Sequence, residues 1–233
     1  MIDFYGLTSP NVQKVFIMLE ECGLKYNFNP VDVWASAQHA PDFEKLNPNK
    51  KIPVIVDHEG PGGKPYTVFE SGAILMYLAE KTGKFMSEDV RKNYDEFQWL
   101  MIQLTGFGPT FGNFTHFNLF APKPADQYSL SRYRSEMLRL YELLDRRLGQ
   151  AKYLGGDEYS IADMATFPWT RQHEAHGAKI NEKPNLKRWF DELNARPAVK
   201  AMIAKQGDIK SSRETATDDH KDRFFNRGKY ARA

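Results

Sequence analysis

The order of strand-like and helix-like segments in the first 84 residues restricts the fold more than any other feature of the sequence. Residues 2–7 form a strand-like run, residues 10–22 place apolar side chains at helical spacing, and residues 25–33 form a second strand-like run. Two strands joined through a helix lie parallel in a sheet, and the crossover between them is right-handed. The chain is therefore expected to open with a β-α-β unit.

A hairpin and a helix are expected after a variable segment. "IPVIVD" (52–57) and "YTVF" (66–69) flank the turn-rich stretch "HEGPGGKP", which is typical of two strands paired as a hairpin. "ESGAILMYLAEKTG" (70–83) has a helical apolar face and ends in glycine. The order β-α-β, variable segment, β-β-α predicts an α/β thioredoxin-like domain over residues 1–84.

The signals that mark helix ends support this order. Ser9 directly before Pro10 is typical of an N-cap followed by proline at the first helical position, and Gly23 is a usual helix stop.

Strand signals disappear from about residue 88. "SIADMATFPW" opens a further helix with Ser160 as its N-cap and Asp163 in its first turn. We expect an all-α domain over residues 88–206. Residues 207–233 are polar and lack a clear helical face, so they are expected to form a tail. The aromatic residues that could hold this tail in place are Phe224, Phe225 and Tyr230.

Composition narrows the classes of function. The 233 residues carry a net charge of +2, which does not favour nonspecific nucleic-acid binding. A single cysteine, Cys22, excludes an intrachain disulfide and a CxxC redox pair. No signal peptide is visible, and no run approaches the roughly 18 apolar residues that a membrane helix needs. We expect a cytoplasmic protein with no membrane and no nucleic acid among its partners.

Thr8, Ser9 and Asn11 lie at the expected N-terminus of the first helix. Backbone N–H groups and the helix dipole favour negative charge there, and a thiolate at such a point has a lowered pKa. The stretch holds no cysteine, so a reactive sulfur would have to come from a ligand. Simple capping by Ser9 is the alternative, and local sequence alone favours it.

Two later motifs offer polar groups at strand ends. In "KKIPV", Pro53 opens a strand, and the backbone of Ile52 could pair with an extended peptide. In "FESGAI", Ser71 begins a helix that can receive a carboxylate, and Glu70 can pair with an amine. A helix cap beside a surface acid explains Glu70 and Ser71 equally well.

Three weaker signals remain. "HEAH" (173–176) lacks an evident third ligand, so no metal is expected. Cys22 lies late in the first helix, away from its positive end, and is expected to be structural. The phenylalanines of "GFGPTFGNFTHF" could form core or line an apolar cleft. They are Phe107, Phe111, Phe114 and Phe117.

Taken together, the motifs resemble a glutathione S-transferase over about residues 1–205. The subgroup that the chain resembles contains the Nu-class bacterial enzymes, which are glutathione-dependent disulfide-bond oxidoreductases, and the related yeast prion nitrogen regulator. The stretches that carry this resemblance are "TSPNVQK", "NPNKKIPVIVD", "VFESGAIL", "GPTFGNFTHF" and "SRYRSEMLRLY".

The resemblance implies roles for individual residues. Asn11 would lie near the glutathione sulfur, with Ser9 or Thr8 as an added hydroxyl donor, and these three are the candidate catalytic residues. Classes that use a tyrosine after the first strand would need it near residue 7 or 8, and Tyr5 is inside the strand. Tyr5 is therefore given no such role.

The remaining implied residues would bind glutathione. Ile52, beside a cis Pro53, would pair with the cysteinyl backbone, while Glu70 and Ser71 would hold the γ-glutamyl end. Lys50 and Lys51 are candidates for the glycyl carboxylate. The full set implied for glutathione binding is Asn11, Gln38, Lys51, Ile52, Pro53, Glu70, Ser71 and Arg132, the last reaching in from the helical domain, where it could meet a second glutathione.

Three functions follow from the resemblance. The first is thiol–disulfide exchange by a bound glutathione thiolate, and the second is conjugation of glutathione to a small electrophile. The third is a non-catalytic regulator, which ranks last because the yeast relative has a long Asn/Gln-rich N-terminal region and this chain starts on a strand. Glutathione is the implied co-substrate, no metal is expected, and a homodimer is implied.

Overall fold

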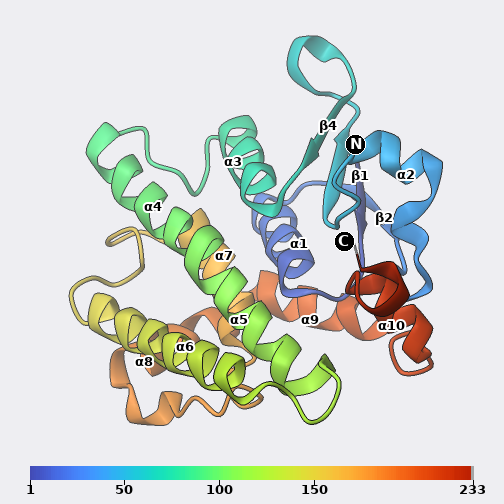
Figure 1. Cartoon of the computed structure of the whole chain (residues 1–233). Coiled ribbons are helices and arrows are strands. Elements are labelled where there is room, and N and C mark those ends of the chain that lie inside the picture. The colour runs from blue at the N-terminus through green and yellow to red at the C-terminus, as the bar shows by residue number, and fades with distance from the viewer. Residues whose placement is uncertain (232–233) are drawn as a thin grey trace. The chain divides into compact units, whose positions relative to one another are not determined.

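A four-stranded mixed sheet forms the centre of the N-terminal part of the chain (Figure 1). The structure is a computed structural model that describes residues 1–231. The strand order is β2-β1-β3-β4. Strand β1 runs parallel to β2 and antiparallel to β3, and β3 pairs antiparallel with β4. The predicted fold class is confirmed: the sheet has the expected parallel crossover and hairpin. The strands are β1 (Ile2–Gly6), β2 (Tyr26–Pro30), β3 (Val54–Asp57) and β4 (Tyr66–Phe69).

Helices connect these strands, and one more helix follows the last of them. Ser9 caps the first helix by accepting the Val12 N–H at 3.3 Å, and Gly23 ends it in the left-handed conformation, as predicted. The α-helices are α1 (Pro10–Cys22), α2 (Pro41–Leu46) and α3 (Ser71–Thr82), and the 3-10 turns are η1 (Val33–Ala35), η2 (Ala37–His39) and η3 (Pro61–Gly63).

Strand β1 and helix α1 approach closely because residue 6 is glycine. A Cβ atom on Gly6 would lie 2.7 Å from Cγ1 of Val12, too close for two non-bonded carbons. On the same face, the ring of Phe4 packs edge-on against Phe16 and Phe28, with centroids 4.8 and 5.4 Å away. This packing places the N-terminus of α1 beside the end of β1.

The opposite face of the sheet is covered by the segment around α2. Phe43 on α2 forms a buried cluster with Val31 and Val54, and Leu46 and Ile52 pack against it. The cluster joins the start of β3 to α2. The loop between α2 and β3 is therefore held at both of its ends.

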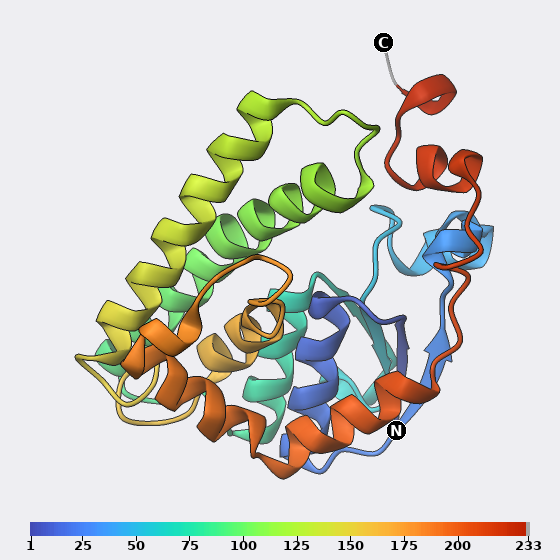
Figure 2. The same ribbon diagram turned by 90° about the horizontal axis from the view of Figure 1, so that it is seen from below.

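The C-terminal stretch belongs with this sheet. Contacts divide the chain into one unit of residues 1–78 with Lys200 onward, and a second unit of residues 79–199. The side chain of Gln206 donates to the Leu7 carbonyl at 3.1 Å, and the Ser212 hydroxyl donates to Asp32 at 2.6 Å. Figure 2 shows the red segment after α9 running beside the blue strand β2. The elements are α9 (Pro197–Asp208), α10 (Asp218–Phe224) and η7 (Gly228–Tyr230).

The second unit is helical. Two of its turns are π-helical, Gln103–Phe107 and His116–Phe120, and they flank a short α-helix. Its α-helices are α4 (Val90–Ile102), α5 (Gly108–Thr115), α6 (Gln127–Leu148), α7 (Ile161–Thr170) and α8 (Pro184–Asn194), and a 3-10 turn η6 covers Ile180–Glu182. No helix within residues 1–231 is long and apolar enough to cross a membrane.

Asp163 is the polar centre of this unit. Ser160 and Asp163 form the capping box of α7, as predicted. The fully buried Asp163 carboxylate also accepts the Leu154 N–H at 3.0 Å and the Trp189 indole N–H at 2.7 Å. Burial raises the pKa of Asp163 to about 6, and the N–H donors oppose that rise. One side chain therefore joins α7, α8 and the loop before α7.

The phenylalanines of the helical unit are mostly core. Phe107, Phe111 and Phe114 are buried, and Phe111 stacks on Tyr141 with centroids 5.0 Å apart. Only Phe117 of the four is partly exposed. Of the two interpretations left open by the sequence, the core one holds for the first three.

We expect Asp163→Asn to lower the free energy of unfolding by about 2–4 kcal/mol, because the new amide NH₂ faces N–H donors and leaves buried groups unpaired. Urea denaturation followed by circular dichroism measures the change. Asp157→Asn is the matched control, since Asp157 is exposed, and it should stay within about 0.5 kcal/mol of wild type. A loss below that margin for Asp163→Asn would contradict the role of this carboxylate.

Candidate functional site

The loop between α2 and β3 presents backbone groups to solvent in a fixed geometry. Buried Asn47 donates from its side chain to the Lys51 carbonyl at 2.8 Å and accepts the Asn49 N–H at 2.9 Å. The peptide bond between Ile52 and Pro53 is cis, as the resemblance implies. Within residues 1–231 the Ile52 N–H has no hydrogen-bond partner. The loop therefore offers a backbone donor that an extended peptide could use.

The turn from β4 into α3 places Glu70 in an unusual conformation. Its φ is 68°, in the left-handed region, which costs a non-glycine residue on the order of 1–3 kcal/mol. Asn49 donates to Glu70 Oε1 at 3.3 Å. Ser71 follows at the first position of α3, where free N–H groups favour a carboxylate. The turn thus sets an acid beside an anion-binding helix start.

Lys14 lies beneath this turn and was not singled out from the sequence. Only 1% of Lys14 is exposed, and its Nζ donates to Ser71 Oγ at 3.3 Å. Burial lowers the pKa of Lys14 to about 7, and the nearby Glu70 carboxylate opposes that shift. The contact joins the first helix to the start of α3 and orients the Ser71 hydroxyl.

These segments enclose a small polar pocket of about 180 Å³. It lies beside the N-terminus of α1, to which Asn11 belongs, so a negative charge placed there meets the positive end of that helix. The residues that line it are Asn11, Asn47, Asn49, Lys51, Ile52, Pro53, Glu70 and Ser71. Six of these are residues that the sequence predicted.

The other predicted residues do not line the pocket. The hydroxyl of Ser9 caps α1, and Thr8 precedes it. Gln38 is buried, and its Oε1 has no hydrogen-bond partner within residues 1–231. Arg132 lies on α6 in the helical unit, 4.0 Å from Glu136. The roles of Thr8, Ser9, Gln38 and Arg132 toward a ligand stay predictions.

Sequence reasoning missed Lys14, Asn47 and Asn49. A usable signal existed for the two asparagines, since "NPN" is turn chemistry directly before the predicted strand. For Lys14 there was little, because a lysine on a helix is usually solvated and its burial depends on tertiary packing.

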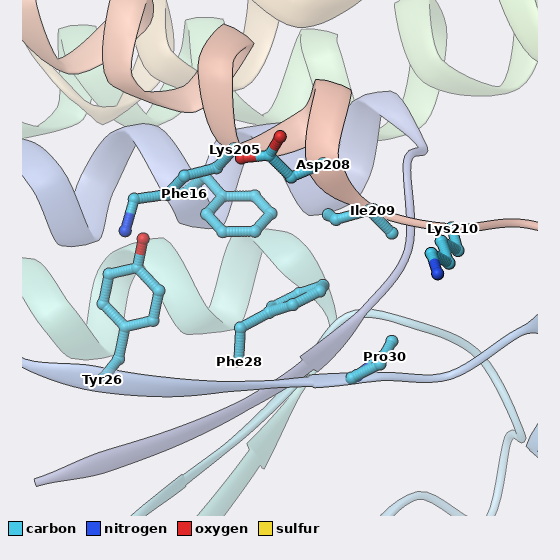
Figure 3. Close-up of a pocket in the computed structure, with 8 residues that line it drawn as sticks. All are labelled: Phe16, Tyr26, Phe28, Pro30, Lys205, Asp208, Ile209 and Lys210. Carbon is cyan, nitrogen blue, oxygen red and sulfur yellow. The ribbon is translucent and has the colours of Figure 1, made fainter.

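A larger pocket lies elsewhere in the first unit and lacks this chemistry. Its volume is about 440 Å³, and it lies at the open edge of the sheet, against β2 and the end of α9 (Figure 3). Its lining is Phe16, Tyr26, Phe28, Pro30, Lys205, Asp208, Ile209 and Lys210. It includes none of the predicted site residues, so we take the smaller polar pocket as the candidate site.

No metal centre accompanies the polar pocket in the described chain. Within residues 1–231, no group of three or more His, Cys, Asp or Glu side chains could hold an ion. His176 of the "HEAH" stretch is buried and shares a hydrogen bond of 2.9 Å with the Tyr141 hydroxyl.

We expect Lys14→Met to remove a pH dependence of stability. The pKa of Lys14 is about 7 in the folded chain against an ordinary 10.5, so the unfolded chain binds more protons between these pH values. The free energy of unfolding therefore rises with pH across that window, by at most about 1.4 kcal/mol per pH unit. Urea denaturation from pH 7 to 9 should show the rise in wild type and not in Lys14→Met.

Lys25→Met serves as the control, because Lys25 is exposed in the same unit. Its stability should follow the wild-type pH curve. Parallel curves for wild type and Lys14→Met would show that the ammonium of Lys14 is not desolvated as described.

Comparison with known proteins places the chain among relatives with this architecture. The family model for the glutathione S-transferase N-terminal domain matches residues 8–81, and the model for the C-terminal domain matches residues 107–197. The disulfide-bond oxidoreductase YfcG of Escherichia coli is 42% identical over 206 residues, which cover 88% of this chain and 95% of YfcG. The E. coli disulfide-bond oxidoreductase YghU is 38% identical, over 85% of this chain and 73% of its own.

Solved structures agree. A glutathione transferase family member from Pseudomonas fluorescens, with two glutathione bound, has a TM-score of 0.82 at 43% identity, over 87% of this chain and 92% of its own. A glutathione transferase from Pseudomonas putida, with one glutathione disulfide bound per subunit, has the same TM-score at 42% identity, over 87% and 90%. Both family models match the chain, and a relative that is 42% identical covers 88% of it, so the chain belongs to the glutathione S-transferase family.

Proposed function

We propose that the protein is a glutathione-dependent thiol–disulfide oxidoreductase, and that the reacting thiolate belongs to bound glutathione. The observation that carries this is the polar pocket at the N-terminus of α1, which has a peptide-pairing edge at Ile52 but no cysteine in its lining. Cys22, at the far end of α1, is roughly 18 Å further along the helix axis. The sulfur must therefore be supplied by the ligand.

The pocket has matching groups for the parts of glutathione. The N–H of Ile52 can pair with the cysteinyl backbone. The γ-glutamyl end, with its amine and carboxylate, would meet Glu70 and the start of α3 at Ser71. This order places the cysteine side chain on the side of Asn11, where the helix dipole and the Asn11 amide stabilise a thiolate.

The reaction then follows ordinary thiol–disulfide exchange. The bound thiolate attacks one sulfur of a substrate disulfide, forms a mixed disulfide and releases the other sulfur as a thiolate, which takes up a proton. A second glutathione attacks the mixed disulfide and releases the second substrate thiol. Two glutathiones supply the two electrons and leave as glutathione disulfide.

The relatives support a reaction of this kind. YfcG and YghU are disulfide-bond oxidoreductases by name. The neighbouring Pseudomonas structures hold two glutathiones or one glutathione disulfide, which are the co-substrate and the product of such a reaction. For this chain we infer the same co-substrate and a small disulfide as the partner.

Conjugation of glutathione to a small electrophile is the second candidate, because the same thiolate could attack carbon. The buried Phe107, Phe111 and Phe114 do not provide an apolar wall for such a substrate. Parallel assays with hydroxyethyl disulfide and with 1-chloro-2,4-dinitrobenzene separate the two functions.

We also propose that the protein is cytoplasmic and that it acts as a homodimer. Chromatography with light scattering tests whether it forms the homodimer.

Cys22→Ser is expected to retain at least about half of the wild-type disulfide reductase activity, because Cys22 lies outside the pocket. Reduction of hydroxyethyl disulfide by glutathione, coupled to glutathione reductase and NADPH, measures it. Complete loss of activity in a folded Cys22→Ser protein would assign the reaction to a protein thiol and overturn the proposal.

Asn11→Ala is expected to lower kcat about 10- to 100-fold, which corresponds to the loss of about 1.4–2.7 kcal/mol when one preorganised donor to a developing charge is removed. The fold should persist, because the helix cap is Ser9. Gln13→Ala, in the same turn of α1, is the control and should keep kcat within about threefold. Unchanged turnover in Asn11→Ala would leave this turn with capping as its only role.

A further inference from the structure

The C-terminal segment 211–230 packs against the turn η1, which follows β2. The Ser212 N–H and hydroxyl donate to one oxygen of Asp32 at 2.8 and 2.6 Å. Arg213 lies with its guanidinium 5.9 Å from the ring of Trp34. Both contacts fix the start of the segment on the residues that begin η1.

Helix α10 continues this contact. The ring of Phe224 lies 4.6 Å from that of Trp34, and Phe225 lies 6.2 Å from it with its ring edge-on. Only 7% of Trp34 is exposed. A largely buried indole with two aromatic neighbours holds α10 in one position. Figure 2 shows this red segment next to the light-blue turns before α2.

The segment reaches the rim of the polar pocket through Lys51. The Lys51 ammonium, which belongs to a pocket-lining residue, lies 5.9 Å from the centroid of the Phe224 ring. Arg223, the preceding residue, is exposed and forms no ion pair within residues 1–231. Because Arg223 precedes Phe224 in α10, the segment carries a second cation into the neighbourhood of Lys51.

A cluster of positive charge results. Burial, with the nearby charges of Arg223, Lys50 and Lys51, lowers the pKa of His39. In the cluster, Lys50 pairs with Glu44 at 2.9 Å. Lys51 and Arg223 have no acidic partner among the described residues, so the rim has charge left to bind an anion.

The direction in which glutathione would lie in the pocket indicates which of its groups meets this positive cluster. With the γ-glutamyl end at Glu70 and Ser71 and the cysteinyl backbone at Ile52, an extended chain advances roughly 3.3 Å per residue. Its glycyl end then lies past Ile52, toward Lys51. The only negative charge at that end of glutathione is the glycyl carboxylate.

We propose that the segment 211–230 is a fixed wall of the glutathione site and that Arg223, together with Lys51, binds the glycyl carboxylate. This inference rests on the proposed function, since it assumes that the pocket binds glutathione. The two family models end at residues 81 and 197, so neither assigns a role to this segment.

The test compares two ligands by titration calorimetry on the full-length protein. Glutathione carries the glycyl carboxylate, and its glycine monoethyl ester does not. Arg223→Ala should weaken glutathione binding roughly fivefold, as expected for a partly exposed charge pair, and leave binding of the ester unchanged. Arg223→Lys should keep the glutathione affinity within about twofold of wild type.

A matched control and an anchor variant complete the experiment. Lys210→Ala removes one positive charge directly before the segment and outside the cluster, and both affinities should stay at wild-type values. Phe224→Ala removes the ring packed on Trp34 and should weaken glutathione binding as much as Arg223→Ala does. A Phe224→Ala protein that binds glutathione as wild type does would show that the packed segment is not needed.

The outcomes separate this inference from the function on which it rests. If wild type fails to bind glutathione at all, the proposed function is wrong. If wild type binds glutathione and Arg223→Ala changes neither affinity, or weakens both ligands equally, Arg223 does not recognise the glycyl carboxylate and only this inference fails.

Discussion

The close approach of β1 and α1 at Gly6 is the constraint on which the candidate site depends. Without a Cβ atom on residue 6, the first turn of α1 can lie against the end of the strand. The positive end of that helix then meets the loop that ends at Pro53 and the turn at Glu70. A Cβ atom on residue 6 would force Val12 on α1 to shift, and Asn11 in the same turn of α1 lines the pocket.

Polar groups around this pocket are costly, and the fold holds them there. Lys14 is almost fully buried, Glu70 has a left-handed backbone, and the buried Gln38 leaves an acceptor unpaired within residues 1–231. Such features cost folding free energy, and they persist only where the surrounding packing holds them in place. They gather in the same unit, and Lys14 and Glu70 converge on Ser71. A site prepared for a zwitterionic ligand accounts for this concentration better than stability does.

Local patterns in the sequence were sufficient for the sheet and for the caps at Ser9 and Gly23, whereas the resemblance to a family supplied six of the residues that line the pocket. These features depend on neighbours along the chain or on a motif shared with relatives. The burial of Lys14 and the bonds of Asn47 depend on tertiary packing, which periodicity does not report. The packing of Phe224 on Trp34 joins residues far apart in sequence, and no local pattern indicated which surface would receive the tail.

The assignment of the stretch from Lys200 onward to the first unit makes the helical unit an insertion within the chain of that first unit. During synthesis the sheet and α1 leave the ribosome early, but the residues that contact Leu7, Asp32 and Trp34 leave only after the helical unit. Domains generally fold as units in the order of their synthesis. Here the helical unit is complete before the first unit is, so a chain that stops after the helical unit leaves Leu7, Asp32 and Trp34 without these contacts.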